Sequence, residues 1–320
     1  MTKQHKVATI FGGTGFIGQQ IVRELAAQGV TIKVATRFPE SAYFLRPCGV
    51  VGQIVPFACD YSDPKSIENA VDGSDYVVNC IGILYEKRKN SFNKVHTDIP
   101  REIAKACKKK KVGKFVHISA LGADRGTSRY AKSKLAGEKA VHKNFKDATI
   151  LRPSVVFGPD DNFFNMFAEL ARYFPALPLI GGGKTKFQPV YVGDVSDAVI
   201  AALHCTKGDD GAAGQIYELG GPDVVNFKEV YEIIFKATQR RRALIPLPWC
   251  VAKLEASVLQ LLPKPLLTRD QVESLKTDNV VADDMPGLEA LGIDATSLKQ
   301  LVPTYLERYR PGGAFAEKAA

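Results

Sequence analysis

KVATIFGGTGFIG, residues 6–18, is an apolar run that stops in a cluster of glycines, and the segment that follows, QQIVRELAAQG, has the apolar spacing of a helix. This order predicts a strand, a tight turn and a helix, the arrangement that opens a dinucleotide-binding unit. The free N–H groups and the positive dipole end of such a helix favour phosphate groups. We therefore expect the pyrophosphate of a nucleotide cofactor at Gly12, Gly13, Thr14, Gly15, Phe16, Ile17 and Gly18.

Further apolar runs predict five more strands, over residues 30–38, 51–60, 76–82, 114–120 and 149–158. Strands that are apolar along their length and alternate with helices are typical of a doubly wound parallel sheet, which binds ligands at the carboxyl ends of its strands. Beyond about residue 160 the chain changes to helices and irregular, proline-rich segments. We therefore expect an α/β fold: a Rossmann domain over residues 1–160, its parallel sheet completed by later segments, and a smaller mixed C-terminal domain over residues 161–320 for a substrate or partner.

Composition limits the class of protein. With 320 residues and 45% apolar content the chain can form a large core, but no apolar stretch is long enough to span a bilayer. The polar residues after Met1 lead directly into the first strand, so we expect no signal or transit peptide and a cytoplasmic location. The six cysteines lack metal-ligand spacing, which predicts buried thiols and no metal site. The net charge of +9 suits an anionic partner, but no recognisable module predicts nucleic-acid binding.

The residues that end the second and third predicted strands bear on the choice of cofactor. In nicotinamide sites an acid there bonds the 2′-hydroxyl of NAD, whereas an arginine accommodates the 2′-phosphate of NADP. This sequence has Arg37 and no acid before Glu40, so we expect NADP(H) to be preferred over NAD(H). Asp60 and Tyr61 fall where the adenine edge would lie, although Asp60 also fits a simple turn. The residues expected near the middle of the cofactor are Cys80, Ile81 and Gly82.

A candidate catalytic relay follows the fifth predicted strand. Tyr130 and Lys134 stand four residues apart in a helical segment and therefore share a face, and with Ser119 they resemble the Ser/Tyr/Lys relay of short-chain dehydrogenases/reductases. An ammonium at about 4 Å could lower the tyrosine pKa of about 10 by about three units, and Lys134 would also bond the nicotinamide ribose. In extended members of that family the active serine usually lies a residue or two later, where this chain has Ala120 and Leu121. Both a complete relay and a lysine kept for ribose binding alone remain open.

Blocks spread over nearly the whole chain resemble one family. They are GGTGFIG, VVNCIGILYEKRKNSFNKVH, HISALGAD, SRYAKSKLAGE, LRPSVVFGPDDNFFNMFA, QPVYVGDVSDAV, YELGGP, LTRDQVESLKTDNVV and PTYLERYR. Together they look like the bacterial relatives of the NADPH-binding accessory subunit of respiratory complex I, the alpha subcomplex subunit 9 family, an atypical branch of the short-chain dehydrogenases. Because no mitochondrial import segment is evident, the chain looks bacterial.

That resemblance implies a bound NADP(H) without established turnover, and a C-terminal domain near the membrane and the quinone site. It implies an accessory or assembly role linked to complex I (NADH:ubiquinone oxidoreductase) or to quinone metabolism. Close relatives act in coenzyme Q biosynthesis or as reductases and epimerases. The alternative is therefore an active NAD(P)-dependent oxidoreductase or epimerase that acts on a sugar nucleotide or a quinone-like carbonyl through Tyr130 and Lys134.

The segment LPWCVAKLEASVLQLLPKPLL, residues 247–267, suggests a partner surface. On a helix Val251, Leu254, Val258 and Leu261 would form one stripe, and Arg240 to Arg242, Lys253 and Lys264 could place positive charge beside it. The sequence leaves two interpretations. The stripe is either a core face of the second domain or a docking surface for complex I or a quinone-biosynthesis assembly, peripheral on the cytoplasmic face of the inner membrane, as the family resemblance favours.

Overall fold

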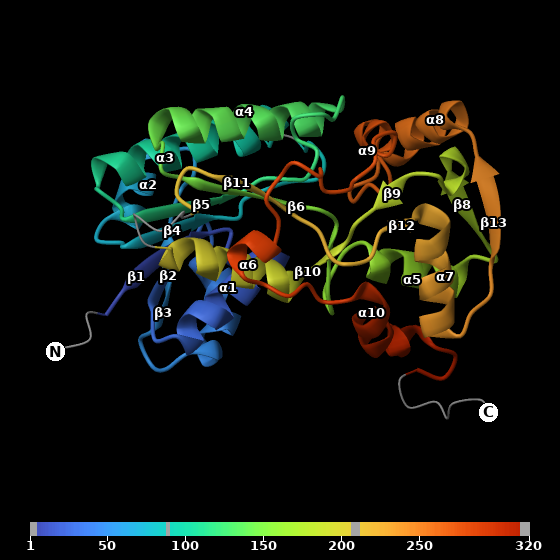
Figure 1. The fold of residues 1–320 in the computed structure, drawn as a ribbon, viewed down its shortest axis with the longest axis horizontal. Coiled ribbons are helices and arrows are strands. Elements are labelled where there is room, and N and C mark those ends of the chain that lie inside the picture. The colour runs from blue at the N-terminus through green and yellow to red at the C-terminus, as the bar shows by residue number, and fades with distance from the viewer. Residues whose placement is uncertain (1–4, 88–89, 206–211, 314–320) are drawn as a thin grey trace.

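A parallel sheet of seven strands forms the centre of the larger domain in this computed structural model, which describes residues 5–87, 90–205 and 212–313 (Figure 1). The strand order is β11-β6-β5-β4-β1-β2-β3, and every neighbouring pair is parallel. The strands are β1 (Val7–Phe11), β2 (Thr31–Thr36), β3 (Ile54–Ala58), β4 (Tyr76–Asn79), β5 (Lys114–Ile118), β6 (Thr149–Pro153) and β11 (Ile216–Leu219). The predicted α/β fold and its six N-terminal strands are confirmed.

Helices cover both faces of this sheet. One face packs on α1 (Phe16–Ala27) and α6 (Val192–His204), and the other packs on α2 (Pro64–Val71), α3 (Ile99–Lys109) and α4 (Arg129–Asn144). Figure 1 shows the two sets on opposite sides of the strands. Because α6 and β11 come after the second domain has begun, later segments complete the sheet and its cover. The domain boundary at residue 160 stays a prediction.

The smaller domain has its own apolar core, built around Phe227, Tyr231 and the aromatic rings that pack on them. Its helices are α5 (Phe164–Tyr173), α7 (Phe227–Thr238), α8 (Trp249–Leu259), α9 (Arg269–Ser274) and α10 (Leu298–Leu306). Its short strands pair as β7 (Val156–Phe157) with β10 (Val190–Tyr191), β9 (Lys186–Phe187) with β12 (Val225–Asn226), and β8 (Ala176–Ile180) with β13 (Ala243–Leu247). The chain also has 3-10 helices in addition to these elements. One, Pro39–Cys48, packs on the larger domain, and the others span Gly181–Gly183, Glu289–Leu291 and Glu307–Tyr309.

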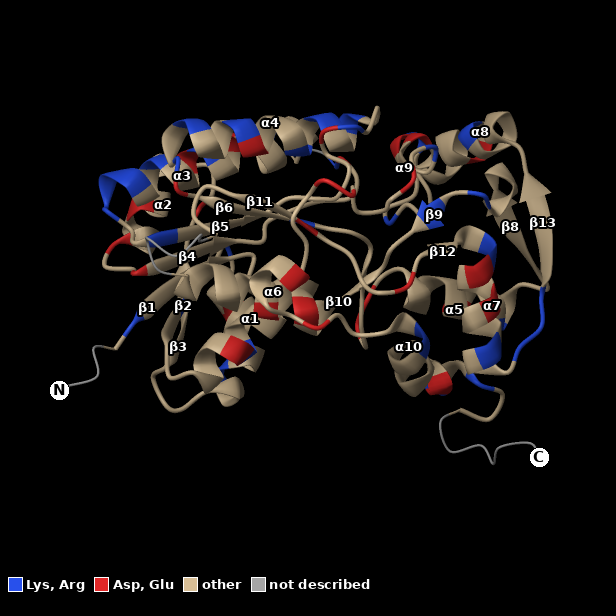
Figure 2. Cartoon of the chain, viewed as in Figure 1, with Lys and Arg blue, Asp and Glu red and all other residues tan. Residues whose placement is uncertain are grey.

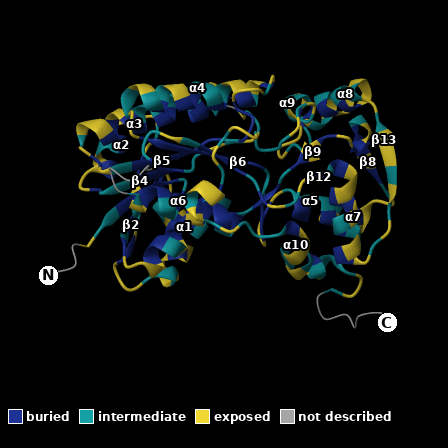
Figure 3. Cartoon of the chain, viewed as in Figure 1, coloured by how far each residue is buried: buried dark blue, intermediate teal, exposed yellow. Residues whose placement is uncertain are grey.

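Helix α8 exposes its large apolar residues. It buries only Ala252 and Ala256, which are four residues apart and let the helix lie close to the domain. The stripe is open: Leu254 is 69% exposed and Val258 65%, and Leu261, just after the helix, is 81% exposed. Figure 3 shows exposed yellow segments along α8. The interpretation of this stripe as a core face is therefore wrong, because the alanines supply the packing face. Within the described residues no helix is long and apolar enough to cross a membrane.

Candidate cofactor and catalytic site

The glycine turn, residues 12–18, joins β1 to α1 at the carboxyl edge of the sheet. Gly12 has a φ of +76°, and a Cβ there would lie 3.0 Å from the backbone carbon of Cys80. Gly15 precedes the first residue of α1, and none of the described side chains caps that helix, so its first N–H groups stay open to an anion. Gly18 lies under the turn, where a Cβ would be 2.2 Å from the carbonyl oxygen of Gly12. The turn therefore fits a pyrophosphate.

The other residues predicted in this turn surround that cradle. Gly13 is buried and Thr14 half-buried, while Ile17 packs against the core of the sheet. The Phe16 ring lies against the backbone of Gly158, where a Cβ would come within 3.2 Å of it. Phe16 thus links the turn to the segment after β7.

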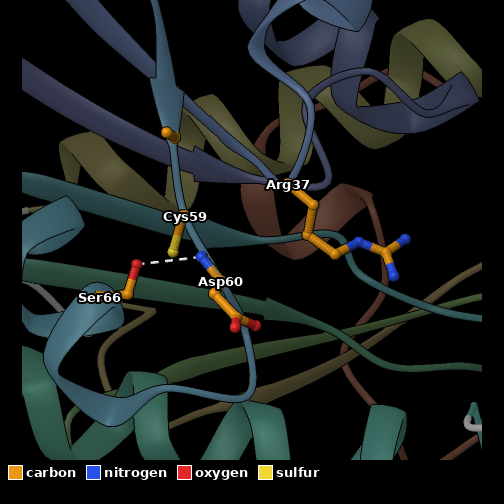
Figure 4. Close-up of a pocket in the computed structure, with 5 residues that line it drawn as sticks. Arg37, Cys59, Asp60 and Ser66 are labelled. Carbon is orange, nitrogen blue, oxygen red and sulfur yellow. Dashed lines mark hydrogen bonds between the residues drawn. The ribbon is translucent and has the colours of Figure 1, made fainter.

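A cavity of about 450 Å³ lies beside the ends of β2 and β3 and is lined by Arg37, Ala58, Cys59, Asp60 and Ser66 (Figure 4). The guanidinium carbon of Arg37 is 5.7 Å from the centroid of the Tyr61 ring. Tyr61 donates to the carbonyl of Ala35 at 2.7 Å, so its ring is fixed. The structure therefore brings Arg37, Asp60 and Tyr61 together, and their role in binding the adenosine phosphate stays a prediction.

Asp60 is held in place by its own turn. Its Oδ1 accepts from the amide and the hydroxyl of Ser62, and these bonds lower the pKa of its carboxyl. Its amide donates to Ser66 Oγ at 3.0 Å, the bond drawn in Figure 4. Ser66 is not among the residues that the sequence predicts for this cavity. The sequence signal that could have placed it is Asp63-Pro64, a capping residue and a proline that start α2 beside the cavity.

The segment after β4 approaches the N-terminal part of α4. Asn79 Oδ1 accepts from the amide of Ile81, and a Cβ on Gly82 would lie 3.5 Å from Lys134 Nζ. Gly82 and Lys134, predicted separately, therefore meet at the same place. Burial raises the pKa of the Cys80 thiol to about 12, so the thiol is neutral and acts as a small apolar group.

Tyr130 and Lys134 share a face of α4, but the printed hydrogen bond of the lysine goes to another element. Lys134 Nζ lies 5.9 Å from the centroid of the Tyr130 ring and donates to the carbonyl of Ile118 at 3.3 Å. No hydrogen bond joins it to the phenol oxygen in the part of the chain that the structure describes. Burial raises the pKa of Tyr130 to about 12 and lowers that of Lys134 to about 8. The expected lowering of the tyrosine pKa is therefore not present.

Ser119 has a different partner. Its hydroxyl donates to Glu138 Oε1 at 2.5 Å, and the same carboxylate receives two bonds from Arg152. Ser119 is only 4% exposed and belongs to this buried ion cluster. The next two residues, Ala120 and Leu121, offer no hydroxyl to a carbonyl substrate.

His96 is a site residue for which the sequence predicted no role. It lies in a π-helical turn, Asn93–Asp98, a type of turn that is frequent at functional sites. Its ring meets the Tyr130 ring edge to face, with centroids 5.3 Å apart, and its Nε2 accepts from the amide of Ile83 at 3.1 Å. The described residues contain no cluster of three or more His, Cys, Asp or Glu that could hold a metal ion.

These features define a dinucleotide-binding Rossmann protein with a second domain beside its cofactor edge. The model of the NAD dependent epimerase/dehydratase family matches residues 8–220. The chain is 39% identical over 308 residues to NADH dehydrogenase (ubiquinone) 1 alpha subcomplex subunit 9, mitochondrial, of Rattus norvegicus, covering 95% of this chain and 80% of that protein. It is 36% identical over 319 residues to the protein of the same name from Arabidopsis thaliana, covering 96% and 79%. The chain therefore belongs to the NAD dependent epimerase/dehydratase family and, within it, groups with the alpha subcomplex subunit 9 proteins.

Solved structures share the fold at lower identity. The NADPH-dependent quinone oxidoreductase QOR2 of Escherichia coli, solved with NADPH, superposes with a TM-score of 0.73 at 19% identity, covering 93% of this chain and 99% of that one. This likeness shows that the two proteins share a fold.

Proposed function

We propose that this protein binds NADP(H) as a structural ligand and acts as an accessory or assembly protein of complex I, or of quinone metabolism. One contrast supports the proposal: the residues predicted for the cofactor gather at the carboxyl edge of the sheet, whereas Ser119 and Lys134 hydrogen-bond to Glu138 and Ile118 rather than to Tyr130. The high pKa of Tyr130 and the engagement of Ser119 by Glu138 both work against catalysis at neutral pH. The names of the relatives at 36% and 39% identity supply the link to complex I.

In this proposal different residues bind different parts of the cofactor. The glycine turn and the N-terminus of α1 would hold the pyrophosphate, Arg37 the 2′-phosphate and Lys134 the nicotinamide ribose. A bound nicotinamide would supply a hydride if a substrate reached it. At a hundred times its dissociation constant a cofactor adds about 2.7 kcal/mol to the stability of the folded state without any chemistry. Mass spectrometry of the ligand released from the purified protein tests this assignment directly.

Arg37→Ala should remove the preference for NADPH. A charge-assisted contact to the 2′-phosphate is worth about 1.5–3 kcal/mol, so we expect NADPH affinity to fall about tenfold or more and NADH affinity to change little. Titration calorimetry with both cofactors measures the ratio, and Arg23→Ala, an exposed arginine on α1, is the matched control. Equal affinities of the unaltered protein for NADPH and NADH would contradict the assignment.

Turnover should be slow or absent. We expect no sustained NADPH oxidation with sugar nucleotides or simple carbonyl compounds, and Tyr130→Phe should leave the residual rate unchanged because a phenol with a pKa of about 12 is a weak acid for protonating a carbonyl oxygen. Absorbance at the nicotinamide band measures the rate, and the melting temperature with and without NADPH measures binding. Rapid turnover that Tyr130→Phe abolishes would overturn this proposal.

That outcome would favour the alternative of an active oxidoreductase or epimerase on a sugar nucleotide or a quinone-like carbonyl. The observation on its side is that Lys134 lies beside both the Tyr130 ring and Gly82. A fold shared with a quinone oxidoreductase is consistent with it but does not assign a substrate.

We further propose that α8 is the docking surface, at the quinone-reducing region of complex I or a quinone-biosynthesis assembly on the cytoplasmic face of the inner membrane. The docking face consists of Val251, Leu254, Val258 and Leu261, all exposed. The segment before β13 carries Arg240, Arg241 and Arg242, blue in Figure 2. Lys253 contributes less charge because it pairs with Glu273 at 2.9 Å. These arginines lie at the opposite end of β13 from α8 and so do not flank the docking face, which suits a contact through its exposed apolar side chains (Figure 2).

Leu254→Asp combined with Leu261→Asp should release the protein from the membrane fraction. Burying two carboxylates in an apolar contact is unfavourable, so we expect membrane recovery at low salt to fall about tenfold or more. Val51→Asp, at a fully exposed valine of the first domain, is the matched control. Recovery of the unaltered protein wholly in the supernatant at low salt, with no quinone-linked protein attached, would contradict docking.

A further inference from the structure

Helix α4, which carries Tyr130 and Lys134, begins at a carboxylate from the second domain. Asp270 Oδ1 accepts from the amide of Arg129 at 2.7 Å, and Oδ2 accepts from the amide of Tyr130 at 3.0 Å. Ser128 Oγ accepts from the amide of Ala131 at 3.2 Å. The first free N–H groups of the helix therefore depend on a residue 140 positions further along the chain.

Helix α9 holds Asp270 firmly in the second domain. Thr268 and Gln271 form a capping box at its start, and Val272 is fully buried. Glu273 on the same helix accepts from Thr127 and pairs with Lys253 of α8 at 2.9 Å. Helix α9 thus lies between α4 and the helix that carries the docking face, as Figure 1 shows.

A chain of hydrogen bonds continues from Tyr130 to the segment after β4. Ser133 Oγ donates to the carbonyl of Tyr130 at 2.7 Å and lies 2.8 Å from His96 Nδ1. His96 Nε2 accepts from the amide of Ile83 at 3.1 Å. These directions agree with one neutral tautomer of His96, protonated at Nδ1, and burial beside Lys134 keeps it neutral by lowering its pKa to about 2.

We propose that Asp270 is a positioning residue through which the second domain sets the cofactor loop, residues 81–83, by way of the Tyr130 backbone, Ser133 and His96. The inference rests on the proposed NADP(H) binding, because Gly82 in this loop lies beside Lys134, the residue assigned to the ribose. A movement of α9 with its domain would remove the Asp270 carboxylate from the start of α4. The loop would then lose the hydrogen-bond chain that runs to it from Tyr130. The position of the second domain and the affinity for the cofactor are therefore coupled.

Asp270→Ala is the primary test, with calorimetry of NADPH binding as its readout. We expect affinity to fall about tenfold, and Asp270→Asn to fall about threefold because the amide oxygen still accepts one of the two bonds. Asp284→Ala, at an exposed acid of the segment that follows α9, should change nothing. In a double-mutant cycle with Ser133→Ala the combined loss should be at least threefold smaller than the product of the single losses, because both act on one chain of bonds.

Amide hydrogen exchange in the absence of NADPH separates this inference from the proposed function. Asp270→Ala should speed exchange at Ile83 as well as at Arg129 and Tyr130, whereas a purely local cap would affect only the last two. Unchanged exchange at Ile83, or an unchanged NADPH affinity in both Asp270 variants, would overturn the coupling. Failure of the unaltered protein to bind NADPH, with faster exchange at Ile83 in Asp270→Ala, would overturn the proposed function alone.

Discussion

Arg152→Met is expected to lower the free energy of unfolding by about 4 kcal/mol, since it leaves the buried Glu138 carboxylate without its paired cation, whereas Glu218 keeps Arg125 at 3.0 Å. Arg152 on β6 is 4% exposed and donates to both oxygens of Glu138 on α4, at 2.9 and 2.8 Å. It also donates to Asp124 at 2.6 Å and to Glu218 on β11 at 3.4 Å. Glu138 and Glu218 are 3% and 0% exposed, so water cannot replace the guanidinium. Methionine keeps much of the volume and removes the charge.

Urea unfolding of the two proteins measures this difference. The control is Lys105→Met, which removes an exposed partner of Glu102 and should change stability by less than about 0.5 kcal/mol. Glu138→Gln should cost less than Arg152→Met, because Arg152 retains Asp124 and Glu218. A loss below about 1 kcal/mol for Arg152→Met would show that the cluster is not a main support of the fold.

The cluster also shows what the sequence could not reveal about Ser119, the partner of its hydroxyl. Its position after the fifth strand agrees with a catalytic serine, but its hydroxyl direction is set by Glu138, which is 19 residues away and on another element. A charged residue inside the apolar run TILRPSVVF was a usable signal, because arginine in a central strand needs buried partners. Which acids supply them depends on how β6, α4 and β11 come together.

The local features were predictable because they follow from periodicity and turn chemistry. The strands, the glycine turn and the shared face of Tyr130 and Lys134 each depend on residues close in sequence. The hydrogen bond from Lys134 Nζ to the carbonyl of Ile118 was not predictable, since it depends on how α4 sits against β5. Spacing could likewise not decide which side of α8 is buried, because Ala252 and Ala256 recur at the same helical interval as the large residues. His96 contacts a helix distant in sequence, and Asp270 bonds across the two domains, so neither left a short-range signal.

Gly18→Ala should abolish cofactor binding and destabilise the protein. A Cβ there would lie 2.2 Å from the carbonyl oxygen of Gly12 and 2.7 Å from the Cα of Gly13, so the clash is with backbone that side-chain rotation cannot relieve. Overpacking of this kind costs about 3 kcal/mol, and the higher helix propensity of alanine returns up to about 1 kcal/mol. We therefore expect a net loss of about 2 kcal/mol in urea unfolding without cofactor, and no NADPH binding by calorimetry.

Gly15→Ala is the matched comparison because it separates the fold from the ligand. Its Cβ would meet only the carbonyl oxygen of Gly12, at 3.3 Å, and its φ of −82° is accessible to alanine. Stability should change by less than about 1 kcal/mol, whereas NADPH affinity should fall because the methyl group occupies the space that a pyrophosphate needs. If Gly18→Ala kept the stability of the unaltered protein, the contact between α1 and the turn would be looser than the structure shows. If Gly15→Ala kept its NADPH affinity, the pyrophosphate would not lie against Gly15. That result would contradict the assignment of the glycine turn and the uncapped start of α1 as the pyrophosphate site.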